Sequence, residues 1–167
     1  MAKKSSSGMT LLIVALVAIP MVLAIIGILA AIAIPAFIGY LGRAKTAEAR
    51  TNLMTIHTAL AASVVDQGLT EAPRIPRTPR DVGCGSKTVV LWSAEDPGWS
   101  AIGFGPPDPL YYSYEVEPLP GGAYVIRATG DLDCDGTYST FELRGHIDPS
   151  TREAVRDGEI VAIAELE

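Results

Sequence analysis

The chain has 167 residues, of which 49% are hydrophobic, and a formal net charge of −6. A chain of this length suits one domain with an appended helix. From residue 66 onward the sequence holds 18 acidic and 8 basic residues, so the C-terminal part is strongly acidic. That acidity excludes a nucleic-acid groove, which needs clustered positive charge, and no direct contact with nucleic acid is expected.

The N-terminal part is dominated by an apolar run. Residues 9–38 contain no charged side chain, and Thr10 carries their only hydroxyl group. The run exceeds the roughly 20 residues that cross a bilayer core, and membrane helices tolerate prolines such as Pro20 and Pro35. Two lysines within the first four residues favour a cytoplasmic N-terminus. We therefore predict a single membrane span with the C-terminal part on the other side.

The helix is expected to continue beyond the span as an amphipathic segment, residues 39–67, that ends at Gly68. From Pro35 to about Asp66, apolar residues recur at spacings near three, four and seven, which predicts a stripe that packs on a sheet. The residues of this predicted stripe are Phe37, Leu41, Ala44, Ala47, Leu53, Ile56, Leu60 and Val64.

The N-terminal third resembles a known family. Residues 24–53, AIIGILAAIAIPAFIGYLGRAKTAEARTNL, are similar to the N-terminal helix of type IV pilins and type II secretion pseudopilins. Gly8 followed by Met9-Thr-Leu-Leu resembles the site at which prepilin peptidase cuts and N-methylates the new terminus. The resemblance therefore implies that residues 1–8 are a leader and that Gly8 and Met9 are the processing residues.

The sequence departs from the family pattern in two places. Pilins usually carry a glutamate a few residues after the cut, whereas here no acid precedes Glu48. The spacing from Met9 to Pro35 is also several residues longer than is usual. Family members without the glutamate resemble the minor subunits that lie at a filament tip.

The resemblance implies a fold, a set of partners and a location. The fold expected is α+β and pilin-like, with a long N-terminal helix packed on a C-terminal antiparallel sheet. The expected partners are other pilin subunits, prepilin peptidase, an inner-membrane assembly platform and membrane lipid. The subunit would start in the inner membrane, with its C-terminal domain periplasmic, and end in a pilus or secretion pseudopilus. The alternative is a non-polymerising, single-pass anchored binding domain, with or without calcium dependence.

The rest of the chain predicts a connector and a sheet. Residues 68–86 carry prolines and arginines in a three-residue rhythm, which is typical of an extended, polyproline-like connector. Residues 87–167 predict an antiparallel sheet. Its strands are expected at residues 87–92, 110–116, 123–129, 140–145 and 159–164, with Trp99, Ile102 and Phe104 as core residues of the loop between the first two.

One acidic segment matches the spacing of an EF-hand loop. Residues 131–142 have acids at the first, third and fifth positions, glycine at the sixth and glutamate at the twelfth. Because Ca²⁺ takes six to eight oxygen ligands, the candidate ligands are Asp131, Asp133, Asp135, the backbone carbonyl of Thr137, and Glu142. The flanking segments are predicted strands rather than helices, however. The other interpretation is an acidic turn in which aspartate and glycine serve the backbone geometry.

Cys84 and Cys134 are the only cysteines. Both lie beyond the span from the lysine leader, on the oxidising side of the membrane. A disulfide between them would close a loop of about 50 residues and stabilise the fold by roughly 4 kcal/mol. The alternatives are two free thiols or a metal site, and zinc is disfavoured because no further cysteine or histidine completes its ligand set.

No pattern in the chain predicts catalysis, and no enzyme activity is expected. Neither a G-x-S-x-G nor an H-E-x-x-H motif is present. The lone His57 has no metal-ligating residue one helical turn away and predicts a surface histidine. His146 with Asp148 and Ser150 predicts a polar turn, because neighbours in sequence rarely form a triad.

Overall fold

The computed structural model describes the backbone of residues 6–80, 92, 96–106 and 110–165, and the side chains of these residues except 6–11 and 13. The chain divides into two compact units, residues 1–41 and 42–167. Helix α1, Ser6–Gln67, contributes to both units and contains Pro20 and Pro35.

The described part of the first unit is helix alone. The described residues between Leu12 and Leu41 are exposed, except Ala30 and Gly39, which are half-buried. The large apolar residues among them expose between 43% and 69% of their surface. A helix that is apolar on every side requires an apolar environment. It is the one helix in the described residues that is long and apolar enough to cross a membrane.

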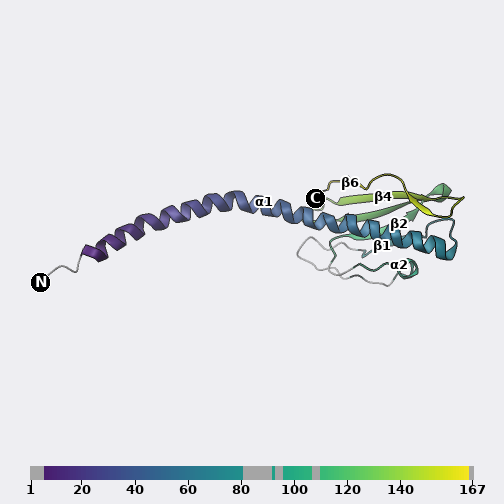
Figure 1. Ribbon diagram of the computed structural model, residues 1–167, viewed down its shortest axis with the longest axis horizontal. Coiled ribbons are helices and arrows are strands. Elements are labelled where there is room, and N and C mark those ends of the chain that lie inside the picture. Colours follow the sequence, from purple (N-terminus) through teal and green to yellow (C-terminus); the bar gives the residue numbers. More distant parts are fainter. Residues whose placement is uncertain (1–5, 81–91, 93–95, 107–109, 166–167) are drawn as a thin grey trace. The chain divides into compact units, whose positions relative to one another are not determined.

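The second unit is an α+β structure in which one side of α1 packs on an antiparallel sheet (Figure 1). The helix ends after Gln67, where Gly68 has a φ of 64° and the N–H of Leu69 donates to the carbonyl of Val64. This is a Schellman ending, for which glycine is the favoured residue. The predicted stop at Gly68 is thus confirmed.

The buried side of α1 matches the predicted stripe only in its C-terminal half. Leu53, Ile56, Leu60 and Val64 are fully buried. The predicted residues before them are exposed, and Thr46 and Ala49 are buried in their place. The apolar pattern predicted the wrong residues here. Ala44 and Ala47 are small, so their burial changes the free energy little. Thr46 can be buried because its hydroxyl bonds to the carbonyl of Arg43.

Within the described residues the sheet has six strands, all paired antiparallel, in the order β1-β2-β3-β4-β5, with β6 also paired to β4. The predicted meander of β2, β3 and β4 is confirmed, although β2 begins later than expected. The final predicted strand is present as β6, and β5 was not predicted. The strands are β1 Ile75–Thr78, β2 Ser113–Pro118, β3 Ala123–Gly130, β4 Ser139–Ile147, β5 Ala154–Arg156 and β6 Val161–Ile163.

Strand β1 corrects the prediction that residues 68–86 form a connector without a strand. It pairs with β2, with Ile75 opposite Val116 and Thr78 opposite Tyr114. The side chain of Ile75 is buried at the edge of the core, and this burial stabilises the pairing of β1 with β2. The strand contains Pro76, which has no backbone N–H to donate. A proline is tolerated in an edge strand because the N–H groups on its outer side bond to no neighbouring strand.

Short helix α2, Pro97–Ile102, lies in the segment predicted as a loop. The carboxylate of Asp96 accepts from the N–H of Gly98 at 2.8 Å and caps the helix. Trp99, Ile102 and Phe104 are buried, as predicted. Trp92 packs edge-on against Trp99 and Phe104. The remaining residues of the predicted strand 87–92 lie outside the described residues.

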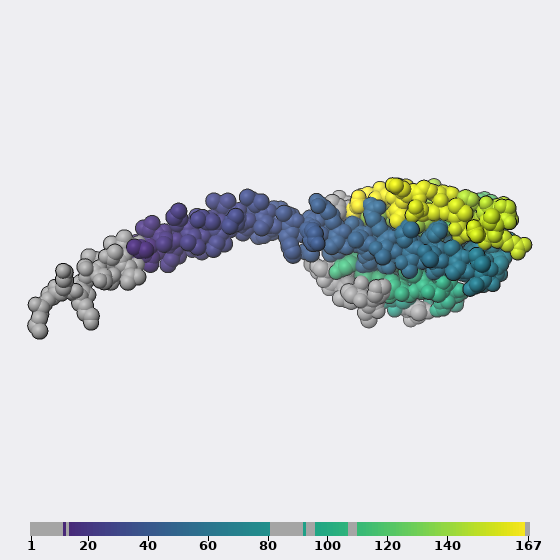
Figure 2. All heavy atoms as spheres, in the orientation of Figure 1, coloured from purple at the N-terminus to yellow at the C-terminus, as the bar shows by residue number. Residues whose placement is uncertain are grey.

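The core of the second unit lies between α1 and the inner side of the sheet. In the view of Figure 2, residues 42–67 of α1 run between two other parts of the unit, which are the C-terminal strands, in yellow, and the teal segment that follows the helix. Alternate residues of each strand face this core, as the two-residue period of a strand requires. They include Tyr114 and Val116 of β2, Tyr124, Ile126 and Ala128 of β3, and Phe141, Leu143 and Ile147 of β4.

Candidate functional site

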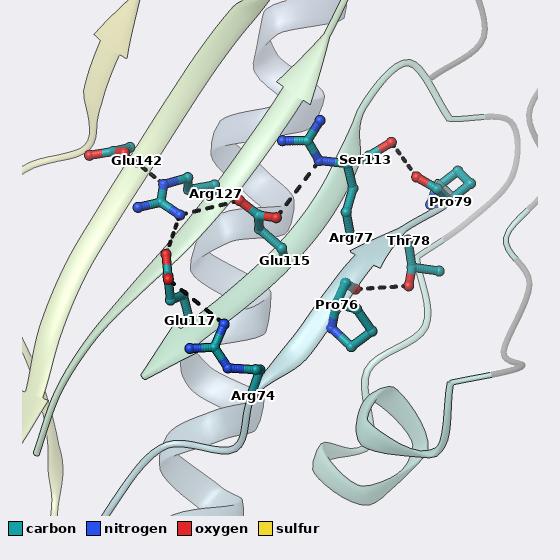
Figure 3. Close-up of polar contacts among 10 residues, drawn as sticks. All are labelled: Arg74, Pro76, Arg77, Thr78, Pro79, Ser113, Glu115, Glu117, Arg127 and Glu142. Carbon is teal, nitrogen blue, oxygen red and sulfur yellow. Dashed lines mark hydrogen bonds and ion pairs between the residues drawn. The ribbon is translucent and has the colours of Figure 1, made fainter. Parts of the chain in front are cut away.

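The outer side of the sheet carries a charged network with Arg127 at its centre (Figure 3). Arg127 lies on β3, between Glu115 and Glu117 of β2 and Glu142 of β4. Its Nε donates to Glu142 at 2.8 Å, and its Nη1 donates to Glu117 at 2.6 Å and to Glu115 at 3.3 Å. One guanidinium group therefore joins three strands, which its planar set of five donors allows.

Further arginines extend this network on both sides. Arg74, just before β1, lies 3.7 Å from Glu117, and Arg77 of β1 lies 3.7 Å from Glu115. On the other side Arg144 donates to Glu142 at 2.8 Å. Opposite charges thus alternate across the strands, an arrangement that favours the observed register.

The network also changes the acidity of its members. Hydrogen bonds from Arg127, and then from Arg144, lower the pKa of Glu142. The pKa of Glu117 is lowered as well, chiefly by its hydrogen bond with Arg127. The pKa of Arg127 is raised, first by Glu142. These carboxylates therefore stay ionised under mildly acidic conditions.

Replacement of Arg127 by methionine is expected to lower the free energy of unfolding by about 2 kcal/mol at neutral pH, because three carboxylates lose their shared partner. Denaturant unfolding measures this loss. The loss should shrink as the pH falls. The pKa of Glu142 is lower in the folded chain than its ordinary value of 4.5, so the ionised side chain stabilises the fold above pH 4.5, and this stabilisation is lost as the pH falls from 4.5 through the folded pKa.

The matched control for Arg127 is Arg144→Met. The Arg144 side chain is 61% exposed, so its loss should cost less than about 1 kcal/mol. Equal losses for the two variants would contradict a central role for Arg127.

The acidic segment after β3 brings three of the predicted calcium ligands together. Oxygens of Asp131, Asp133 and Asp135 lie within 4.8 Å of one another. Asp131 also accepts from the backbone N–H groups of Cys134, at 2.8 Å, and Gly136, at 3.2 Å. Asp135 accepts from the N–H of Thr137 at 2.6 Å, which lowers the pKa of Asp135. These bonds are those of a turn stabilised by its own side chains.

The prediction of Glu142 as the twelfth ligand of a calcium loop is wrong. Glu142 lies inside β4, opposite Arg127, and both of its oxygens are bonded to arginines. The strand explains the error, because an EF-hand delivers this glutamate from a helix that follows the loop. Three exposed or half-buried carboxylates remain close together, and without Glu142 the ligand set of an EF-hand loop is incomplete.

The predicted disulfide has only one end within the described structure. Cys134 lies in the acidic turn with a φ of 75° and is not a free thiol. Cys84 lies outside the described residues. The Cys84–Cys134 pairing therefore stays a prediction.

A polar contact between α1 and the sheet has no counterpart among the sequence predictions. Glu48 accepts from the backbone N–H of Tyr111 at 3.1 Å and from the hydroxyl of Tyr114 at 2.9 Å. The Tyr114 oxygen in turn accepts from Asn52 at 2.8 Å. Burial raises the pKa of Glu48, and these hydrogen bonds partly offset that effect. The sequence signal that could have predicted this contact is the spacing of Glu48 and Asn52, which lie one helical turn apart beside the apolar stripe.

Gly8 and Met9, the predicted processing residues, lie within α1, near its start at Ser6. The side chains at these positions are among those that the structure does not describe. From Leu12 to Leu41 the chain continues as the exposed apolar helix of the first unit.

The described residues therefore define a class of protein: an α+β unit preceded by one apolar helix that is able to span a membrane. No known family model, curated protein or solved structure matches the chain. Any narrower assignment has to be argued from the residues themselves.

Proposed function

We propose that the chain is a pilin-like structural subunit of a type IV pilus or a type II secretion pseudopilus, and that its role is assembly rather than catalysis. The observation that carries the proposal is helix α1. It runs from Ser6 to Gln67, its described large apolar residues from Leu12 to Leu41 are exposed, and it packs on an antiparallel sheet beyond residue 45. The resemblance of residues 24–53 to pilins supports the same assignment.

The proposed mechanism is the transfer of an apolar helix between two apolar environments. The span first lies in the inner membrane, with the second unit outside the cytoplasm. Prepilin peptidase removes residues 1–8, and an assembly platform moves the helix into a bundle with those of neighbouring subunits. Because lipid and bundle are equally apolar, solvation changes little, and close packing between helices decides the stability of the filament.

The N-terminus of the mature protein tests this proposal. Mass spectrometry of the chain from its native host is expected to show a first residue of methylated Met9. Replacement of Gly8 by leucine should leave the leader in place, since the small residue at the cut is lost, whereas the control Ser6→Ala should be processed normally. A native chain that begins at Met1 or Ala2 would contradict the proposal.

A second candidate is a single-pass anchored domain that does not polymerise. It is favoured by the absence of any acid between Met9 and Ala47, where pilins usually carry a glutamate. Cross-linking in whole cells followed by shearing separates the two candidates. Recovery of the chain in sheared fibres supports the subunit, and recovery only as a membrane-bound monomer supports the anchor.

A further inference from the structure

Two polar atoms without hydrogen-bond partners face the boundary between α1 and the sheet. They are Nε2 of His57, on α1, and the hydroxyl of Tyr124, on β3; both are buried and unbonded. The two rings lie 6.2 Å apart between centroids, with 43° between their planes. Buried polar atoms are normally hydrogen-bonded, so an unbonded pair at one contact calls for an explanation. The prediction of an ordinary surface histidine is thus wrong for this ring.

The strands around His57 offer it positive charge and no carboxylate partner. Arg156 of β5 lies against α1, with Nη1 3.2 Å from the sulfur of Met54. Met54 precedes His57 by three residues and is its neighbour on the helix surface. The carboxylate after Arg156 belongs to Asp157, which bonds to Nδ1 of His146 at 2.8 Å. None of the described carboxylates forms a hydrogen bond or ion pair with His57.

Strand β4 adds no charged group at this point. It passes Tyr124 at Gly145, where a Cβ would lie 2.5 Å from the Tyr124 hydroxyl and from the carbonyl oxygen of Val155. On β3 the titratable group that faces His57 is Tyr124 itself, and burial raises its pKa. The ring of His57 therefore contacts the ring of Tyr124, and the charge that acts on it is that of Arg156.

We propose that His57 is an acid-sensitive latch between α1 and the sheet, which holds the helix on β3 and β5 when neutral and loosens it when protonated. A neutral imidazole can leave Nε2 as a bare acceptor, at a limited cost. An imidazolium has to place a charged N–H donor at this buried position, beside the positive charge of Arg156. This inference concerns the second unit and does not depend on the proposed filament role.

The sign of the effect follows from the environment of the ring. Burial, and then the charge of Arg156, lowers the pKa of His57 below its ordinary value of 6.5. The unfolded chain therefore takes up this proton at a higher pH than the folded chain. Stability is complete above pH 6.5 and is lost as the pH falls toward the folded pKa. Glu48 acts in the opposite direction, because its pKa is raised, so the latch has to be read from a comparison of variants.

The test compares the full chain in detergent micelles with the variants His57→Gln and His146→Gln, unfolded by denaturant between about pH 7.5 and about pH 4.5. Relative to His57→Gln, the unfolding constant of the wild type is expected to rise by up to about tenfold per pH unit below pH 6.5. His146→Gln is the matched control and should keep this dependence. Equal pH dependence in the wild type and His57→Gln would overturn the proposal.

Proton NMR of the wild type provides a second readout that needs no variant to fold. The imidazole C–H resonance of His57 should titrate below pH 6.5, and amide exchange of residues 53–64 should speed up over the same range. A His57 that titrates at or above 6.5 would rule out the latch.

Discussion

Replacement of Leu60 by alanine is expected to lower the free energy of unfolding of the second unit by about 2–5 kcal/mol. Leu60 is fully buried on the side of α1 that faces the sheet. Removal of its side chain leaves a cavity among helix and strand residues that cannot all move to fill it. Denaturant unfolding of the full chain in detergent micelles, followed by tryptophan fluorescence, measures the loss.

The matched control on the same helix is Val65→Ala. Val65 is 63% exposed, so its truncation should change stability by less than about 0.5 kcal/mol. If the two variants unfolded at the same denaturant concentration, α1 would not pack on the sheet through the side that carries Leu60.

Replacement of Ile28 by arginine is expected to reduce the assembled fraction of the chain at least tenfold while leaving it in the membrane. Ile28 lies near the middle of the apolar run. A charge at the centre of a spanning helix costs about 2.5–3.5 kcal/mol, which the many other apolar residues of this helix can offset. Between closely packed helices, by contrast, the same charge has neither water nor a partner. Quantification of sheared fibres against membrane fractions measures the effect.

The control for this variant is Ile28→Leu, which keeps the volume and the apolar character and should assemble normally. Fibres in wild-type amount from Ile28→Arg would contradict close packing of the apolar helix as the basis of assembly. Absence of the wild-type chain and of Ile28→Leu from the sheared fibres would instead favour the anchored domain.

Much of the fold could be predicted from local pattern. The strands β2, β3 and β4 were recognisable because they are rich in β-branched and aromatic residues, and a proline–glycine turn separates β2 from β3. Gly68 marked the helix end because few other residues adopt its backbone conformation at low cost. The buried positions of Trp99 and Phe104 followed from their size alone.

The errors occurred where the role of a residue depends on partners far along the chain. The acidic segment fitted the spacing of a calcium loop, but its last residue lies on a strand between two arginines. Strand β1 was missed because its prolines argue against a strand, and only the pairing with β2 shows that it lies at an edge. His57 gave no local sign that its ring would be half-buried and in contact with Tyr124 of β3.

By itself, the sequence determined the apolar helix, the meander and the acidity of the second unit, because these depend on composition and on short-range periodicity. Only the tertiary structure decided the phase of the buried side of α1, the arginine-centred network and the environments of Glu48 and His57. The physical reason is that charge pairing and desolvation depend on which groups meet in space. Residues 10 to 115 positions apart supply those groups here, as Arg127 with Glu117 and Arg50 with Glu165 illustrate.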